Sequence, residues 1–155
     1  MKRILLFALG LHLLILAPNA FSAISFRAAG TVATASVGAS LAPGKPTGTL
    51  STDILVCKIM INGSARTITA PAGWTLMNRT NNGTTISGAM YWARGSVAST
   101  TFTLSAGSTA VGFIEGYVGV NNTTPVDVAA AGQANVSSTS ITAPSITTVT
   151  AGARP

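Results

Sequence analysis

Short segments in which apolar and polar residues alternate, separated by turn-forming residues, run through this chain from Ile24 onward. The most apolar of them after residue 22 spans residues 53–61, and it has the length and the β-branched content of a strand. Because both of its faces are apolar, we expect a central strand that is buried on both faces for most of its length. Abundant Ser and Thr disfavour long helices and suit strands and turns. The sequence therefore predicts an all-β fold.

A rigid turn at residues 70–75, Ala-Pro-Ala-Gly-Trp-Thr, delivers a large aromatic side chain directly into the following strand. Pro71 fixes one backbone angle, and Gly73 allows a conformation that other residues avoid. We expect Trp74 to anchor the core. Further turns are predicted by Asn-Gly at residues 62–63 and by the Pro- and Gly-rich stretch 41–52.

The later segments assign their side chains to two faces by a period of two. Residues 86–94 place Ile86, Gly88, Met90 and Trp92 on one face and Ala89, Tyr91 and Ala93 on the other. In residues 101–105, Phe102 and Leu104 point inward. Residues 111–120 carry Phe113, Glu115 and Tyr117 on one face and Ile114 and Val118 on the opposite one.

Strands at this spacing predict an antiparallel β-sandwich, jelly-roll-like in type, formed by a single domain over residues 23–155. Residues 129–140 contain little to bury, and we expect an irregular stretch there. A weak last strand is predicted within residues 141–149.

Residues 1–22 resemble a secretory signal peptide that forms a hydrophobic helix. Lys2 and Arg3 provide the positive start, and an apolar run follows. The small residues Ala20 and Ser22 occupy the two positions that a signal peptidase reads. Cleavage is expected after Ser22, with cleavage after Ala23 as an alternative. The apolar run is shorter than the ~20 residues that span a bilayer, which disfavours an uncleaved anchor. We therefore expect a secreted, extracellular protein, periplasmic in transit, with no membrane span after cleavage.

The chain has few charged residues, 8% of the total, and its formal net charge is +6. Removing residues 1–22 leaves seven basic and three acidic residues, a net charge of +4. The basic residues are spread along the chain, whereas a nucleic-acid-binding protein concentrates Lys and Arg along the path of the phosphates. We expect no nucleic-acid partner.

The residue types that most enzymes use for catalysis are nearly absent. The one histidine, His12, lies within the predicted signal, and Cys57 is the one cysteine. This pattern disfavours Ser-His-Asp and Cys-His catalysis and zinc sites, so we expect no enzyme activity, no metal and no cofactor. We expect Cys57 to be a buried small hydrophobe, with pairing between molecules as the alternative.

The acidic side chains are Asp53, Glu115 and Asp127. Asp53 and Asp127 are interpreted as turn or strand-end residues. Glu115 lies in an apolar segment. If its side chain faces solvent, Glu115 is an ordinary surface residue. If it faces the core, the buried carboxylate requires a basic partner, for which Lys58 and Arg94 are candidates. A hydrolase that uses Asp127 or Glu115 ranks last among the functional hypotheses.

Five short motifs together resemble modules of phage tail or fibre-associated proteins, prophage structural proteins and some bacterial secreted proteins. The matching stretches are residues 52–56, 70–75, 89–92, 117–120 and 125–127. The resemblance spans residues 24–149 and implies a structural β-sandwich without common catalytic residues. The sequence departs from the pattern of these modules in two ways. Ala70 replaces the first Pro of the turn, and the sequence ends at a point where such modules continue with further strands. We therefore expect either a module that is incomplete at its C-terminus or a sandwich that closes differently.

Two functional hypotheses follow. The first is a non-enzymatic secreted or virion-associated module for structure or adhesion, which self-assembles or binds protein partners. The second is a carbohydrate-binding module that contacts a cell-surface glycan through surface aromatic residues and Asn-rich loops. Tyr91 and Trp92 are the candidate ligand-binding residues, and because they are adjacent in a strand, one belongs to the core and the other to the surface.

Overall fold

The computed structural model describes residues 23–134, residues 142–150 and residue 153. The predicted signal peptide, its helix and the cleavage position after Ser22 lie outside the described residues. The described part of the chain contains strands, turns and extended segments and no helix, which confirms the all-β prediction. None of these residues belongs to a helix of the length and apolarity that a bilayer crossing requires.

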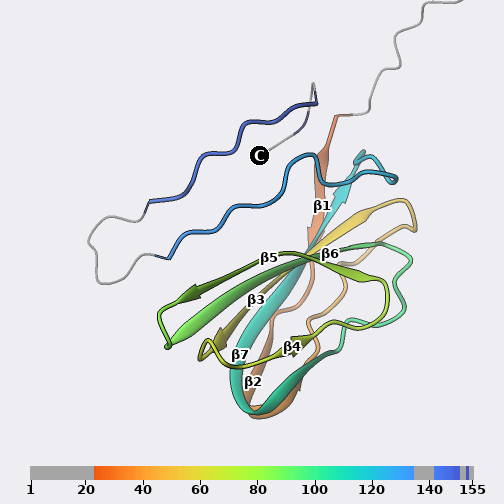
Figure 1. Ribbon diagram of the computed structural model, residues 1–155. Coiled ribbons are helices and arrows are strands. Elements are labelled where there is room, and N and C mark those ends of the chain that lie inside the picture. Colours follow the sequence, from red (N-terminus) through yellow and green to blue (C-terminus); the bar gives the residue numbers. More distant parts are fainter. Residues whose placement is uncertain (1–22, 135–141, 151–152, 154–155) are drawn as a thin grey trace, which may run out of the picture.

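Seven strands form one antiparallel sheet, in which β1, β7, β3, β6 and β5 are neighbours in that order (Figure 1). β2 and β4 also pair with β7. The strands are β1 (Ser25–Ala29), β2 (Ala33–Leu41), β3 (Ile54–Asn62), β4 (Ile68–Thr69), β5 (Trp74–Asn82), β6 (Ile86–Arg94) and β7 (Phe102–Val118).

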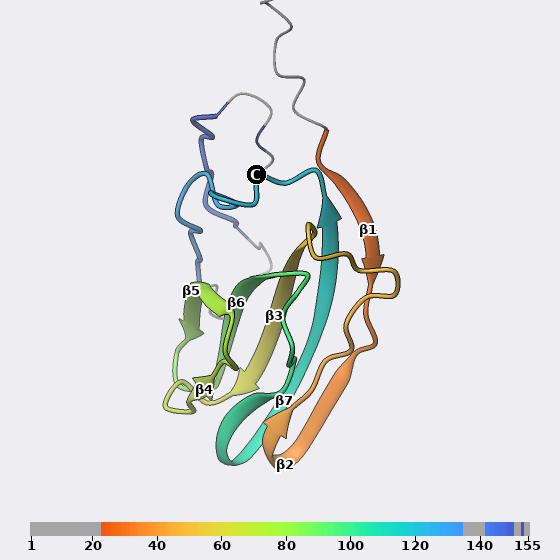
Figure 2. The same cartoon turned by 90° about the vertical axis from the view of Figure 1, so that its right-hand side faces the viewer.

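The long strand β7 joins two parts of the sheet because it bends. Gly107 has a φ of 73°, a conformation that favours glycine, and the Ser108 hydroxyl donates a hydrogen bond to the Ser105 carbonyl across the bend. Beyond the bend β7 pairs with β3 and β1, and before it β7 pairs with β4. β2 follows β7 through the bend, and both strands curl together at one end of the molecule (Figure 2).

The core lies between the β3–β6 part of the sheet and the first residues of β7. The Phe102 ring packs against Trp74 at 5.4 Å and against Tyr91 at 5.1 Å between ring centroids. Phe102 and Leu104 are almost completely buried, and Trp74 is 8% exposed. The predictions of an inward Phe102 and Leu104 and of Trp74 as a core anchor are confirmed.

The prediction that the strand at residues 53–61 is buried on both faces for most of its length is wrong, because the face that carries Ile54 and Met60 is buried only at Ile54, which is 3% exposed. Leu55, Cys57, Ile59 and Ile61 belong to the core, whereas Met60 on the other face is 45% exposed. An apolar sequence shows that a strand can be covered on both sides, but the covering layer depends on distant parts of the chain. The burial predicted for Cys57 is confirmed.

After β7 the chain continues without strands along the β5–β6 side of the molecule (Figures 1 and 2). Arg94 donates a hydrogen bond to the Asn122 carbonyl, and Asn78 Nδ2 donates to the Ala130 carbonyl at 2.9 Å. Residues 129–134 are irregular, as predicted. The weak strand predicted within residues 141–149 is wrong for the described residues 142–149, which pair with no strand. Their Ser- and Thr-rich sequence has few apolar side chains to bury.

Candidate functional site

The face of the sheet that points away from the core, here called the outer face, is built by alternate residues of three neighbouring strands. Lys58 of β3 lies opposite Met90 of β6 and Phe113 of β7. Val56 likewise lies between Trp92 and Glu115. The outer face consists of Ile54, Val56, Lys58, Met60, Gly88, Met90, Trp92, Arg94, Val111, Phe113, Glu115 and Tyr117, together with Phe26 at the β1 edge.

Large apolar side chains on the outer face are open to solvent. Phe26 is 57% exposed, Met60 45% and Val111 39%. The Phe26 ring contacts the Tyr117 ring edge-on, with 6.0 Å between centroids, so the aromatic surface continues from β7 to β1. Neighbouring side chains of one face of a sheet interact directly, and here they form a connected apolar surface.

An ion pair lies in the middle of this surface. Lys58 Nζ is 2.7 Å from Glu115 Oε2, and the Tyr117 hydroxyl donates to the same oxygen at 3.2 Å. Lys58 Nζ also lies 5.5 Å from the centre of the Phe113 ring, within the range of a cation–π contact. Burial, and secondarily the nearby Glu115, raises the pKa of Tyr117. Glu115 therefore faces away from the core, and of its two candidate partners it binds Lys58.

The other two carboxylates are held elsewhere, by different groups. Asp53 is buried against Arg27, and it accepts a hydrogen bond from the Leu50 N–H at 2.7 Å. Asp127 accepts a hydrogen bond from the N–H of Val149, also at 2.7 Å. Both are thus turn or loop residues with structural partners. Among the described residues, no group of three or more His, Cys, Asp and Glu side chains gathers at a distance that suits a metal ion.

The two adjacent aromatic residues of β6 lie on opposite faces. Tyr91 is 4% exposed, and its hydroxyl donates to the Ile68 carbonyl at 3.4 Å. Burial raises the pKa of Tyr91. A ring in this position is not accessible to a ligand. Trp92 is half-buried on the outer face, next to Val56 and Thr75 on the neighbouring strands.

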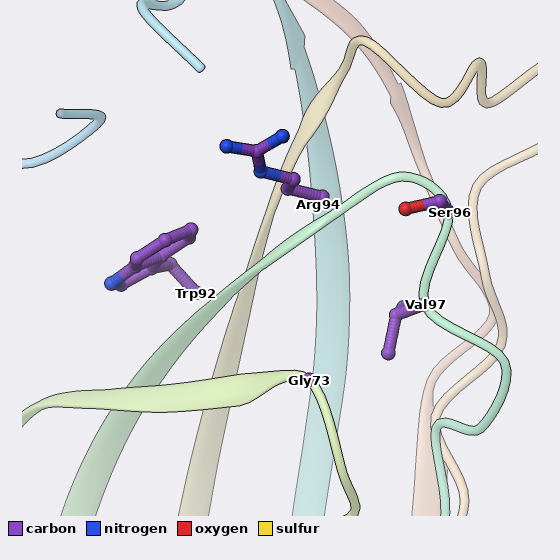
Figure 3. A pocket seen from close by; sticks show the side chains of 5 residues that line it. All are labelled: Gly73, Trp92, Arg94, Ser96 and Val97. Atoms are coloured by element: carbon purple, nitrogen blue, oxygen red, sulfur yellow. The ribbon is translucent and has the colours of Figure 1, made fainter. Parts of the chain in front are cut away.

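Trp92 borders a hollow of about 210 Å³ at the end of β6 (Figure 3). Arg94 lies two residues further along the same face, and Ser96 and Val97 follow β6. Gly73, with a φ of 90°, closes the hollow from the turn before β5, and a β-carbon at this position would lie 3.2 Å from Val97 Cγ2. The turn that directs Trp74 into the core thus also forms one wall of the hollow.

Sequence reasoning identified Trp92 but missed Arg94, Ser96 and Val97 as neighbours in a site. The signal for Arg94 was present, because residues two apart in a strand share a face. Nothing local indicated that residues 96 and 97 turn back toward Gly73.

The charge in the hollow is positive, and among the described residues it has no carboxylate partner. Within the part of the chain that the structure describes, Arg27–Asp53 and Lys58–Glu115 are the two ion pairs, and Asp127 accepts backbone N–H groups. Arg94 instead donates to the Asn122 carbonyl, which holds the guanidinium beside the Trp92 ring (Figure 3).

Comparison with known proteins does not assign the chain to a family. No family model matches it, and neither a curated protein nor a solved structure matches it significantly.

Proposed function

We propose that the chain is a non-enzymatic β-sandwich module, jelly-roll-like in type, that serves structure or adhesion in a secreted or virion-associated assembly. The observation that supports this function is the connected apolar surface of the outer face, with Phe26, Met60 and Val111 open to solvent. Soluble monomers rarely expose connected apolar patches of this kind, which mark interaction surfaces.

A second copy of this chain is the partner that the outer face fits best. Its centre holds one basic and one acidic side chain side by side, Lys58 and Glu115, within apolar surroundings. When two such faces meet about a two-fold axis, the Lys58 of each copy can approach the Glu115 of the other. The apolar rim would then be buried on both copies, which supplies the driving force for association.

Sedimentation of the full chain tests this assembly. We expect a dimer, and we expect Met60→Lys and Val111→Lys to shift it to the monomer, because a charge would be buried in the interface without a partner. Val32→Lys is the matched control, because Val32 is 62% exposed and lies between β1 and β2, outside the outer face. A monomeric wild type that also binds no protein of a larger assembly would contradict the proposal.

The extracellular location belongs to the same proposal, and it is supported by the sequence of residues 1–22. The intact mass of the protein exported from expressing cells tests it. We expect the chain to begin at Ala23, after cleavage behind Ser22. A protein that stays in the cytoplasm with its first residues intact would contradict this location, and a membrane-bound uncleaved chain would indicate the anchor.

Glycan binding is the second candidate function, and the hollow beside Trp92 favours it. An indole ring at the wall of a surface hollow offers a flat apolar platform against which a sugar ring can stack. We expect Trp92→Ala to lose glycan binding while the protein stays folded. Tyr91→Ala is instead expected to destabilise the fold by about 3–5 kcal/mol, because a buried aromatic residue is removed from the core. Circular dichroism of both variants separates the two effects.

A further inference from the structure

We propose that the hollow beside Trp92 binds a sugar residue that carries a carboxylate, and that Arg94 pairs with this carboxylate. The inference rests on the second candidate function, glycan binding, and adds the class of sugar and the residue that selects it.

The size of the hollow limits the ligand to one ring. Sites that enclose a drug-sized ligand measure about 300–1,000 Å³. At about 210 Å³ the hollow is smaller, and it is open on the outer face. Gly73 and Val97 form one wall of the hollow, and Trp92 stands on the opposite side (Figure 3). One sugar residue of a longer glycan can therefore stack on Trp92, while its neighbours extend over the sheet.

The charge of the hollow selects among such sugars. Arg94 has no carboxylate of the chain as a partner among the described residues, and one of its Nη groups is used by the Asn122 carbonyl. A guanidinium has five N–H donors in a planar fork, so most of them remain available. A carboxylate accepts two such donors at once, which a neutral sugar hydroxyl cannot do.

The surroundings of Arg94 favour a sugar acid over a free anion. Trp92 contributes an apolar ring that a small anion would not use, and Ser96 adds a hydroxyl on the side of Arg94 (Figure 3). Arg94 is itself exposed, so its attraction to a carboxylate is screened by salt. Affinity therefore requires both the stacking surface and the charge, and it decreases as the salt concentration rises.

The test measures binding of three acidic glycans to the full chain by calorimetry: trigalacturonate, a hyaluronate tetrasaccharide and 3′-sialyllactose. The methyl ester of each is its neutral counterpart. We expect at least one acid to bind about tenfold more tightly than its ester, since a charge-assisted hydrogen bond pair is lost. Arg94→Gln should remove this preference. Arg66→Gln is the control, because it removes the same charge from a residue whose guanidinium donates to the Ala106 carbonyl, away from the hollow.

Each contrary outcome overturns a defined part of the inference. Equal binding of an acid and its ester would overturn the role of the carboxylate and leave glycan binding in place. Binding of sodium acetate as tight as that of the acidic glycans would show a simple anion site and overturn the role of the sugar. Binding of none of the six glycans would overturn both the inference and the glycan-binding function. Loss of the preference in Arg66→Gln as well would show a nonspecific effect of net charge.

Discussion

The guanidinium of Arg27 holds the buried carboxylate of Asp53 with two contacts. Arg27 Nε lies 2.6 Å from Asp53 Oδ2, and Arg27 Nη2 donates to Oδ1 at 3.0 Å. The Asp53 carboxylate also accepts the Leu50 N–H, and its backbone carbonyl accepts the Gly95 N–H. The Asp53 side chain thus connects β1 to the turn before β3, and the Asp53 backbone carbonyl connects this turn to the residue that follows β6.

We expect Asp53→Asn and Arg27→Met each to lower the free energy of unfolding by on the order of 2–3 kcal/mol. Removing one partner of a buried pair leaves the other without compensation, and the 24% exposure of the Arg27 side chain reduces the cost. Denaturant unfolding of both variants and of the double variant measures the coupling between the two residues. Single-variant losses that simply add in the double variant would contradict a direct interaction.

Cys57 is expected to react only after unfolding. Burial raises the pKa of its thiol to about 12. Relative to a thiol with the ordinary pKa of 9.0, the reactive thiolate is then about a thousandfold scarcer at neutral pH. A colorimetric disulfide reagent should label the protein slowly in buffer and rapidly in denaturant. A disulfide-linked dimer on a non-reducing gel would instead support pairing between molecules.

The contact of Asp127 with the C-terminal segment is expected to depend on pH. Hydrogen bonds from Thr150 and from the Val149 N–H hold the pKa of Asp127 below its ordinary value of 3.8. The lowered pKa means that this contact stabilises the fold above pH 3.8, and that the contribution is lost as the pH falls through the lower pKa of the folded state.

Amide NMR of Val149 and Thr150 measures this dependence. Their resonances should be constant above pH 5 and shift toward random-coil positions below about pH 3. Asp127→Asn should show the shifted positions at every pH. Unchanged resonances in this variant would contradict the contact.

The sequence predicts faces better than it predicts layers. The alternation in β6 correctly separated Tyr91 from Trp92, because the direction of a side chain in a strand follows from its position alone. Trp74 was predicted to lie in the core because a rigid turn precedes it. These assignments need no knowledge of distant residues.

Contacts between residues that are far apart in the sequence could not be predicted in this way. The Arg27–Asp53 pair joins residues that no sequence pattern connects, and the hollow depends on the contact between Val97 and the turn at Gly73. The strand expected within residues 141–149 failed for a related reason, since β-propensity without an apolar face does not secure a neighbouring strand. The face of β3 that carries Met60 is apolar in sequence but is left partly exposed by the fold. These exposed apolar side chains suggest that the face binds a partner.

A charge exchange between copies tests whether that partner is a second copy of the chain. Lys58→Glu leaves two acidic side chains at the centre of the outer face, and Glu115→Lys leaves two basic ones. Each variant alone should be monomeric, because two like-charged faces repel each other. A mixture of equal amounts should form a heterodimer, since each acidic face then meets a basic one.

Both side chains are partly exposed, 40% for Lys58 and 21% for Glu115, so each variant is expected to fold. Thermal unfolding followed by circular dichroism checks this directly. Native mass spectrometry of the mixture distinguishes the heterodimer from either homodimer. If the mixture stays monomeric while the wild type dimerises, the two-fold contact does not run through Lys58 and Glu115. If the wild type is monomeric but its outer face binds a different protein of an assembly, the partner of this face is that protein and not a second copy of the chain.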